Sequence, residues 1–194
     1  MLWLQKKGKK IFGEHFKIFE EDKLLVHKLL SYFLKDELEA QKWHIDLEKG
    51  ILLTGPIGSG KTSLMMLMRY FTSPENKFLF KSCRQISFEF AEHGHEIIHH
   101  YSTNKLYDYE FKIYCFDDLG VENNLKHYGN ECNVIAEILL SRYDLFISHK
   151  LLTHLTTNLS ASEMEVNYGN RVRSRMREMF NLIAFEKNCR DKRS

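Results

Sequence analysis

The sequence predicts an α/β fold in which helices cover both faces of a five-stranded, mostly parallel sheet. Two observations lead to this prediction. Short apolar segments of strand length recur along the chain, and the longer segments between them have apolar residues at helical spacing. Because strands that alternate with helices are joined by right-handed crossovers, the strands run parallel and the helices fall on both faces of one sheet.

The clearest strand is the apolar segment Gly50–Thr54, which has Gly50 at its start and Gly55 directly after its end. In chain order, the expected strands are 50–54, 77–82, 111–116, 151–157 and 182–185. The expected helices are 23–40, 63–71, 84–101, 131–147 and 168–180. We expect residues 1–45 to form an N-terminal arm and helix, and residues 46–194 to form the main domain.

Composition indicates an ordinary globular chain. Its 194 residues fit one domain, with 43% apolar and 28% charged residues. The net charge of +2 gives no global attraction to nucleic acid or to a membrane. No apolar run has the length of a membrane span or signal peptide, and the four cysteines form no CxxC pair. We therefore expect a soluble cytoplasmic protein with reduced thiols and no membrane partner.

A phosphate-binding loop follows the first strand. Gly55, Gly60, Lys61 and Thr62 satisfy the pattern G-x-x-x-x-G-K-[ST] between a strand and a helix. Glycines allow successive backbone N–H groups to face phosphate oxygens, the lysine reaches the β- and γ-phosphates, and the threonine hydroxyl reaches Mg²⁺. The sequence thus predicts a P-loop site for ATP (or GTP), formed by Gly55, Pro56, Ile57, Gly58, Ser59, Gly60, Lys61, Thr62 and Ser63.

Two carboxylates end the third expected strand. A P-loop enzyme needs a carboxylate beside the loop to hold the Mg²⁺ shell, and we assign this role to Asp117. Asp118 would then polarise or orient the attacking water. The intervening strand 77–82 favours an ATPase-like arrangement over kinase-type P-loop folds, in which the two motif-bearing strands are adjacent.

The fourth expected strand ends on Thr156-Thr157-Asn158, which would place a polar side chain between the P-loop and Asp118. Further along, arginines occupy every second position from Arg171 to Arg177 in a predicted helix. Three uses of these arginines remain open: a solvated basic face, contact with DNA phosphates, or an arginine finger inserted into a neighbouring subunit's site.

Together, the motifs resemble the DnaC/IstB-type branch of the AAA+ ATPases, the helicase-loader and transposition-helper proteins. The resemblance covers about residues 45–188 and rests on segments that stand in order along the chain. These segments are Gly55–Thr62, Cys115–Gly120, Thr156–Ser160 and Tyr168–Met176.

The resemblance implies roles for particular residues. Asn158 becomes the sensor-1 residue, Arg175 the favoured arginine finger and Arg171 the second candidate. Residues 46–194 become an AAA+ core without an obvious C-terminal lid, so that Arg190 is a candidate to replace a lid arginine. The implied protein is a homo-oligomeric, Mg²⁺-dependent ATPase, slow unless assembled or stimulated by DNA. Its implied partners are single-stranded DNA and a replicative helicase or transposase.

Three alternatives belong to other functional classes. One is a non-hydrolysing nucleotide-dependent switch or scaffold, and another is a small-molecule kinase, for which no acceptor-binding segment is evident. The third is a zinc peptidase, because His95, Glu96 and His99 satisfy H-E-x-x-H. No GxxH continuation follows His99, so we expect a solvated, histidine-rich helix there.

Overall fold

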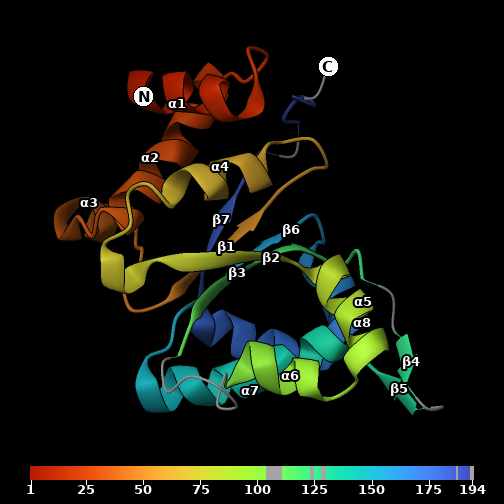
Figure 1. Ribbon diagram of the computed structural model, residues 1–194. Helices are drawn as coiled ribbons and strands as arrows, with labels where there is room; N and C mark the ends of the chain where they lie inside the picture. Colours follow the sequence, from red (N-terminus) through yellow and green to blue (C-terminus); the bar gives the residue numbers. More distant parts are fainter. Residues whose placement is uncertain (104–110, 123–124, 128–129, 187, 193–194) are drawn as a thin grey trace.

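A five-stranded parallel sheet forms the centre of the protein (Figure 1). The computed structural model describes residues 1–103, 111–122, 125–127, 130–186 and 188–192. The strand order is β2-β3-β6-β1-β7, and every adjacent pair is parallel. This confirms the predicted sheet, whose strands are β1 Gly50–Thr54, β2 Phe78–Ser82, β3 Ile113–Leu119, β6 Thr153–Thr157 and β7 Phe180–Ala184.

Helices cover both faces of this sheet, as the sequence predicts (Figure 1). One face carries α1 Leu2–Phe12, α2 Lys23–Phe33, α3 Glu37–Lys42 and α4 Lys61–Met68. The other carries α5 Cys83–His93, α6 Glu96–Ser102, α7 Val134–His149 and α8 Ala161–Met179. Two short 3₁₀ helices, η1 Glu20–Asp22 and η2 Pro74–Asn76, and a small antiparallel hairpin, β4 Leu125–His127 and β5 Asn130–Cys132, were not predicted. In the described part of the chain, no helix is long and apolar enough to cross a membrane.

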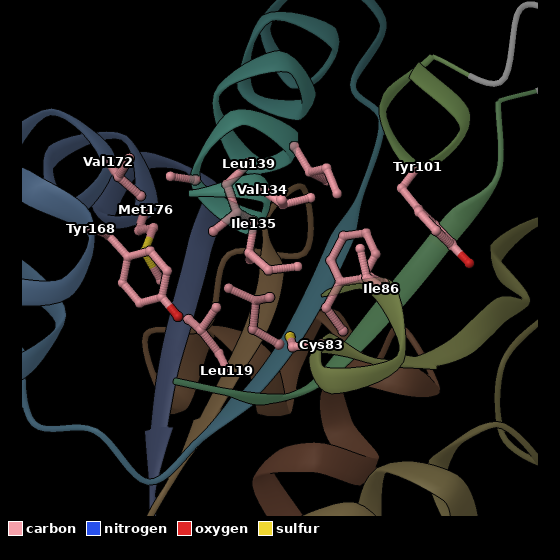
Figure 2. Packing of buried hydrophobic residues seen from close by; sticks show 14 of the residues in the cluster. Cys83, Ile86, Tyr101, Leu119, Val134, Ile135, Leu139, Tyr168, Val172 and Met176 are labelled. Atoms are coloured by element: carbon pink, nitrogen blue, oxygen red, sulfur yellow. The ribbon is translucent and has the colours of Figure 1, made fainter. Parts of the chain in front are cut away.

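Each face of the sheet has its own apolar core. Under α7 and α8, aliphatic side chains of the two helices meet residues from the end of β3 and from α5 (Figure 2). The labelled members are Cys83, Ile86, Tyr101, Leu119, Val134, Ile135, Leu139, Tyr168, Val172 and Met176. Cys83, Cys115 and Cys189 are free thiols, while the Cys132 side chain lies outside the description.

Two of the predicted helices are interrupted. The range 23–40 contains α2 and α3, because Lys35 turns into the left-handed region at φ 56° and the Asp36 side chain then caps α3 by accepting from the Glu39 N–H at 3.1 Å. The range 84–101 is divided between α5 and α6, because Gly94 (φ 65°, ψ −146°) ends the first of them. The last predicted helix begins earlier than expected, at a Ser160–Glu163 capping box.

A buried histidine on β6 makes stability depend on pH. His154 is 2% exposed, and its Nδ1 accepts the Ile51 N–H at 3.1 Å. The ring centroid of Phe78 lies 4.9 Å away. Burial lowers the pKa of His154 to about 3. The folded state thus holds a neutral imidazole at pH values where the unfolded chain takes up a proton.

We expect stability to fall as the pH drops below 6.5. The folded pKa is depressed, so the stability is fully present above the unfolded pKa of about 6.5 and is lost towards the folded value of about 3. Between pH 7 and pH 5 this group alone should remove about 2 kcal/mol from the free energy of unfolding. Urea unfolding at both pH values measures it. His154→Asn, which retains an acceptor and cannot titrate, should lose this contribution, and parallel pH profiles would refute the assignment.

Candidate nucleotide-binding site

The sheet order brings three loop starts together at one edge. β6 lies between β1 and β3, and Thr157 pairs with Thr54 of β1 and with Leu119 of β3. The glycine loop after β1, the acidic residues at the end of β3 and the polar residues after β6 therefore meet at the carboxyl edge of the sheet. This is where ligands bind in open α/β folds.

The glycine loop has a backbone conformation at two positions that glycine adopts readily and other residues rarely adopt. Gly58 and Gly60 adopt φ values of 80° and 90°, and Lys61 begins α4 directly afterwards. The Lys61 Nζ donates to the carbonyl oxygens of Gly55 and Pro56, each at 2.9 Å, and the residue is only 5% exposed. The loop thus encloses a buried ammonium group at a helix N-terminus, an arrangement suited to an anion.

A cavity of about 390 Å³ opens beside this loop. Its lining includes six of the nine predicted nucleotide-binding positions and two predicted catalytic residues. The former are Ile57, Gly58, Gly60, Lys61, Thr62 and Ser63, and the latter are Asp118 and Asn158. Other lining residues were not predicted, namely Phe12, His15, Phe16, Lys17, Val121 and Lys192. Ser59 is buried, and in the described part of the chain its hydroxyl has no hydrogen-bond partner. The cavity therefore combines donors for phosphate with aromatic groups from the N-terminal segment.

Asp117 is held between two threonines. The Thr62 hydroxyl donates to its two carboxylate oxygens at 3.0 and 3.1 Å, and the Thr156 hydroxyl donates to Oδ1 at 2.6 Å. Thr156 also accepts the backbone N–H of Asp118 at 2.9 Å, so one hydroxyl fixes both acidic residues. Burial raises the pKa of Asp117, against these hydrogen bonds. Sequence reasoning assigned no role to Thr156; its place in the polar strand end was the available signal.

The donor set beside the loop fits magnesium. Mg²⁺ is commonly held by one or two carboxylates together with phosphate oxygens and water. Here one hydroxyl, from Thr62, and one carboxylate, from Asp117, already lie in contact at the loop. Over the residues that the structure describes, no group of three His, Cys, Asp or Glu side chains could hold a metal ion alone. A cation at this site would thus depend on the nucleotide for its other ligands.

Asp118 has an unusual backbone. Its φ of 54° lies in the left-handed region, and the pairing of β3 with β6 shifts register between Phe116 and Leu119. This bulge directs Asp117 and Asp118 differently. Asp117 meets Thr62, whereas Asp118 lines the cavity together with Asn158.

The arginines of α8 do not line this cavity. Arg173 forms an ion pair with Glu165 of the same helix, and the Arg175 guanidinium lies 4.7 Å from the ring centroid of Tyr143. Arg171 and Arg177 are exposed. The arginine helix lies on the opposite face of the sheet from α4, which follows the P-loop (Figure 1).

The C-terminal segment lies against the P-loop. The Lys192 N–H donates to the Gly58 carbonyl at 3.0 Å, and its Nζ pairs with the buried Asp22 at 2.6 Å. Arg190, the candidate for a lid arginine, instead pairs with Glu21 at 3.0 Å and does not line the cavity. Of these two basic residues, Lys192 is the one that lines the cavity.

The H-E-x-x-H segment, His95–His99, does not line the nucleotide cavity. His95 precedes α6, Glu96 and His99 lie within it, and all three are exposed. The His95 ring packs edge-on against Phe90, with centroids 5.6 Å apart. The segment is thus part of the outer helical layer, away from the cavity.

Comparisons with known proteins identify the fold. No protein-family model and no curated protein matches the chain. Among solved structures, DnaI matches with a TM-score of 0.58 at 17% identity, covering 88% of each chain. The DnaC helicase loader matches with a TM-score of 0.50 at 18% identity over 72% of this chain and 79% of the other. A DNA replication initiation factor matches with a TM-score of 0.55 at 17% identity over 89% of this chain and 48% of the other. This chain therefore shares its fold with these three proteins, which confirms the predicted α/β fold and, at the level of the fold, the predicted resemblance to helicase loaders.

Proposed function

We propose that the chain is a Mg²⁺-dependent ATPase of the helicase-loader type that acts in the cytoplasm. The observation that carries the proposal is that P-loop residues, Asp118 and Asn158 line one cavity, while Asp117 contacts Thr62 of that lining. These are the parts that phosphoryl transfer from a nucleotide requires, because its catalysis consists mainly of positioning and charge stabilisation.

Each part has a defined task. Lys61 would leave the loop carbonyls and donate to the β- and γ-phosphates, while the Thr62 hydroxyl and the Asp117 carboxylate would hold Mg²⁺. Bound Mg²⁺ would neutralise charge on the phosphate oxygens. Asp118 would polarise the attacking water, and Asn158 would orient it. Phe12 and Phe16 also line the cavity, and their rings would offer an apolar wall for the base.

The catalytic arginine would act on a neighbouring subunit. None of the α8 arginines lines the chain's own cavity, and Arg175 is only partly exposed, stacked on Tyr143. An arginine supplied in trans would complete the site only in a homo-oligomer, with Arg175 as the favoured finger and Arg171 as the second candidate. Activity should therefore depend on assembly.

The likeness to helicase loaders supports the proposed partners. The DnaC helicase loader and a DNA replication initiation factor share the fold. We therefore place single-stranded DNA and a replicative helicase or transposase among the partners. Stimulation of turnover by single-stranded DNA would support this. Binding of ATP without turnover, with or without DNA, would favour the non-hydrolysing switch.

Mixing two inactive variants tests whether the catalytic site is shared between neighbouring subunits. Arg175→Ala should bind ATP normally but lose about 10³-fold in turnover, the size of an arginine-finger effect. Lys61→Ala should also be inactive, because it lacks the phosphate-binding lysine. When the two are mixed, the intact Arg175 of one subunit should serve the intact P-loop of the other and restore turnover.

Arg177→Ala is the matched control, because Arg177 lies on the same helix and is exposed. It should keep wild-type turnover. If Arg175→Ala hydrolyses ATP at the wild-type rate, the finger assignment is wrong. If the mixture stays inactive although the variants associate, the site is not shared between subunits.

A further inference from the structure

One buried contact joins the acidic loop after β3 to the arginine helix. The Glu122 carboxylate accepts the Gly120 N–H through Oε2 at 2.9 Å and the Tyr168 hydroxyl through Oε1. Tyr168 belongs to α8 and is 46 positions away in sequence. Figure 2 shows its ring inside the core under α7, with the hydroxyl oxygen directed towards Leu119 at the end of β3.

The contact lies in a protected environment. Tyr168 is 8% exposed and packs in the same apolar cluster as Leu119 and Val172. Burial raises the pKa of both Glu122 and Tyr168. A hydrogen bond from a hydroxyl to a carboxylate is stronger in such surroundings than at the surface. The link between loop and helix should therefore persist while either partner moves.

The loop end of this link begins at the nucleotide cavity. Asp118 lines the cavity, and Gly120 and Glu122 follow it two and four positions later. Gly120 has no room for a side chain, because a Cβ there would lie 2.5 Å from Leu159, the residue after Asn158. A shift of Asp118 or Asn158 on nucleotide binding would therefore move the Glu122 backbone as well.

The helix end of the link adjoins a bend. Gly169 (φ 80°, ψ 162°) interrupts α8 immediately after Tyr168. Among the residues that the structure describes, no atom beyond its chain neighbours and the adjacent helix backbone lies within 4 Å of the position its Cβ would take. All four arginines follow this bend. The ion pair between Glu165 and Arg173 spans it. Tyr168 thus anchors the first part of α8, and Gly169 lets the arginine-bearing part, residues 170–179, change direction.

We propose that Glu122 and Tyr168 are positioning residues that couple the chain's own nucleotide cavity to the arginine-bearing part of α8. The inference rests on the proposed function, in which an α8 arginine acts on a neighbour's nucleotide. Occupancy of the cavity moves the loop 118–122, the Glu122–Tyr168 hydrogen bond transmits the shift, and the bend at Gly169 changes the reach of the arginines. The nucleotide in one subunit thereby adjusts hydrolysis in the next.

Tyr168→Phe tests the coupling, because it removes the hydroxyl and keeps the ring in the core. Loss of a hydrogen bond to a charged group corresponds to about a tenfold or larger effect. In the ligand-free protein, amide hydrogens of residues 170–179 should exchange about tenfold faster. In the assembled enzyme, kcat should fall about tenfold while KM and equilibrium binding of ATP stay within about twofold of wild type.

Tyr101→Phe is the matched control. The Tyr101 hydroxyl donates to the Glu89 carboxylate at 2.6 Å, the residue is 4% exposed, and it lies on α6. This variant should lose similar stability but leave kcat and exchange over 170–179 unchanged. Gly169→Ala is a second test, since its added methyl meets open space but disfavours the bend. It should slow exchange over 170–179 and also lower kcat.

The outcomes separate the inference from the proposed function. Hydrogen exchange needs no turnover, so wild-type exchange over 170–179 in Tyr168→Phe overturns the link even if the protein is inactive. Faster exchange with an unchanged kcat overturns the coupling to catalysis. A fall in kcat equal to that of Tyr101→Phe shows a purely structural role and overturns it too. Absence of turnover in the wild-type assembly, with normal ATP binding, counts against the proposed function instead.

Discussion

Replacement of Lys61 by alanine should weaken ATP binding by at least about 100-fold, because hydrogen bonds from a charged donor to two phosphates contribute about 3 kcal/mol or more. Lys61 is 5% exposed, and its Nζ is already held inside the loop by the Gly55 and Pro56 carbonyls. A bound triphosphate would offer that ammonium anionic acceptors in place of neutral ones. Alanine supplies no donor there, and solvent reaches the buried site poorly.

Isothermal titration with ATP in the presence of Mg²⁺ measures this loss. Lys42→Ala is the control, since it removes the same charge from an exposed i, i+3 pair with Glu39 on α3. Lys42→Ala should bind ATP as the wild type does, and both variants should unfold at similar denaturant concentrations. Equal ATP affinity in wild type and Lys61→Ala would show that this loop does not hold the phosphates.

Replacement of Arg142 by methionine should lower the free energy of unfolding by about 3–5 kcal/mol, because it leaves buried oxygen acceptors without donors. Arg142, on α7, is 1% exposed. Its guanidinium donates at 2.7–3.0 Å to the Thr153 hydroxyl and to three carbonyl oxygens, those of Tyr101, Lys112 and Leu152. It thereby ties α7 to the end of α6 and to the amino ends of β3 and β6.

Relief of a buried charge opposes part of this loss. Burial disfavours the cation and lowers the pKa of Arg142 to about 9. The guanidinium also lies 5.3 Å from the Tyr114 ring centroid, a favourable contact. We expect the orphaned acceptors to outweigh the relief. Urea unfolding measures the difference, with Arg84→Met, an exposed arginine on α5, as control. A loss below about 1 kcal/mol would show that water replaces the lost donors.

The sheet and the phosphate loop could be predicted because their signals are local. The strand Gly50–Thr54 and the loop that follows it occupy consecutive residues, and strand–helix alternation alone implies a parallel sheet. Asp117 and Thr62, assigned to one metal site from separate motifs, are in hydrogen-bond contact. Each motif lies within one short stretch of sequence, so only the order of the strands was needed to predict where the motif lies in the fold.

The remaining features depend on contacts between distant residues. Thr156 reaches Asp117 across 39 positions, Tyr168 reaches Glu122 across 46, and Lys192 reaches Asp22 across 170. No spacing rule relates such pairs before the fold is known. The break at Gly94, in contrast, had a local signal in the sequence, because a glycine within a predicted helix can mark its end. The prediction of one continuous helix gave more weight to the helical spacing of the apolar residues.

The central claim is that the cavity beside Gly55–Ser63 binds ATP with magnesium. The most direct test is calorimetric titration of the wild-type chain with ATP, once with Mg²⁺ and once with a chelator. The account predicts one ATP per chain, weaker binding without Mg²⁺, and no comparable binding by Lys61→Ala. The claim is contradicted if the wild type shows no saturable ATP binding at millimolar nucleotide. It is also contradicted if the Lys61→Ala variant binds ATP as tightly as the wild type does.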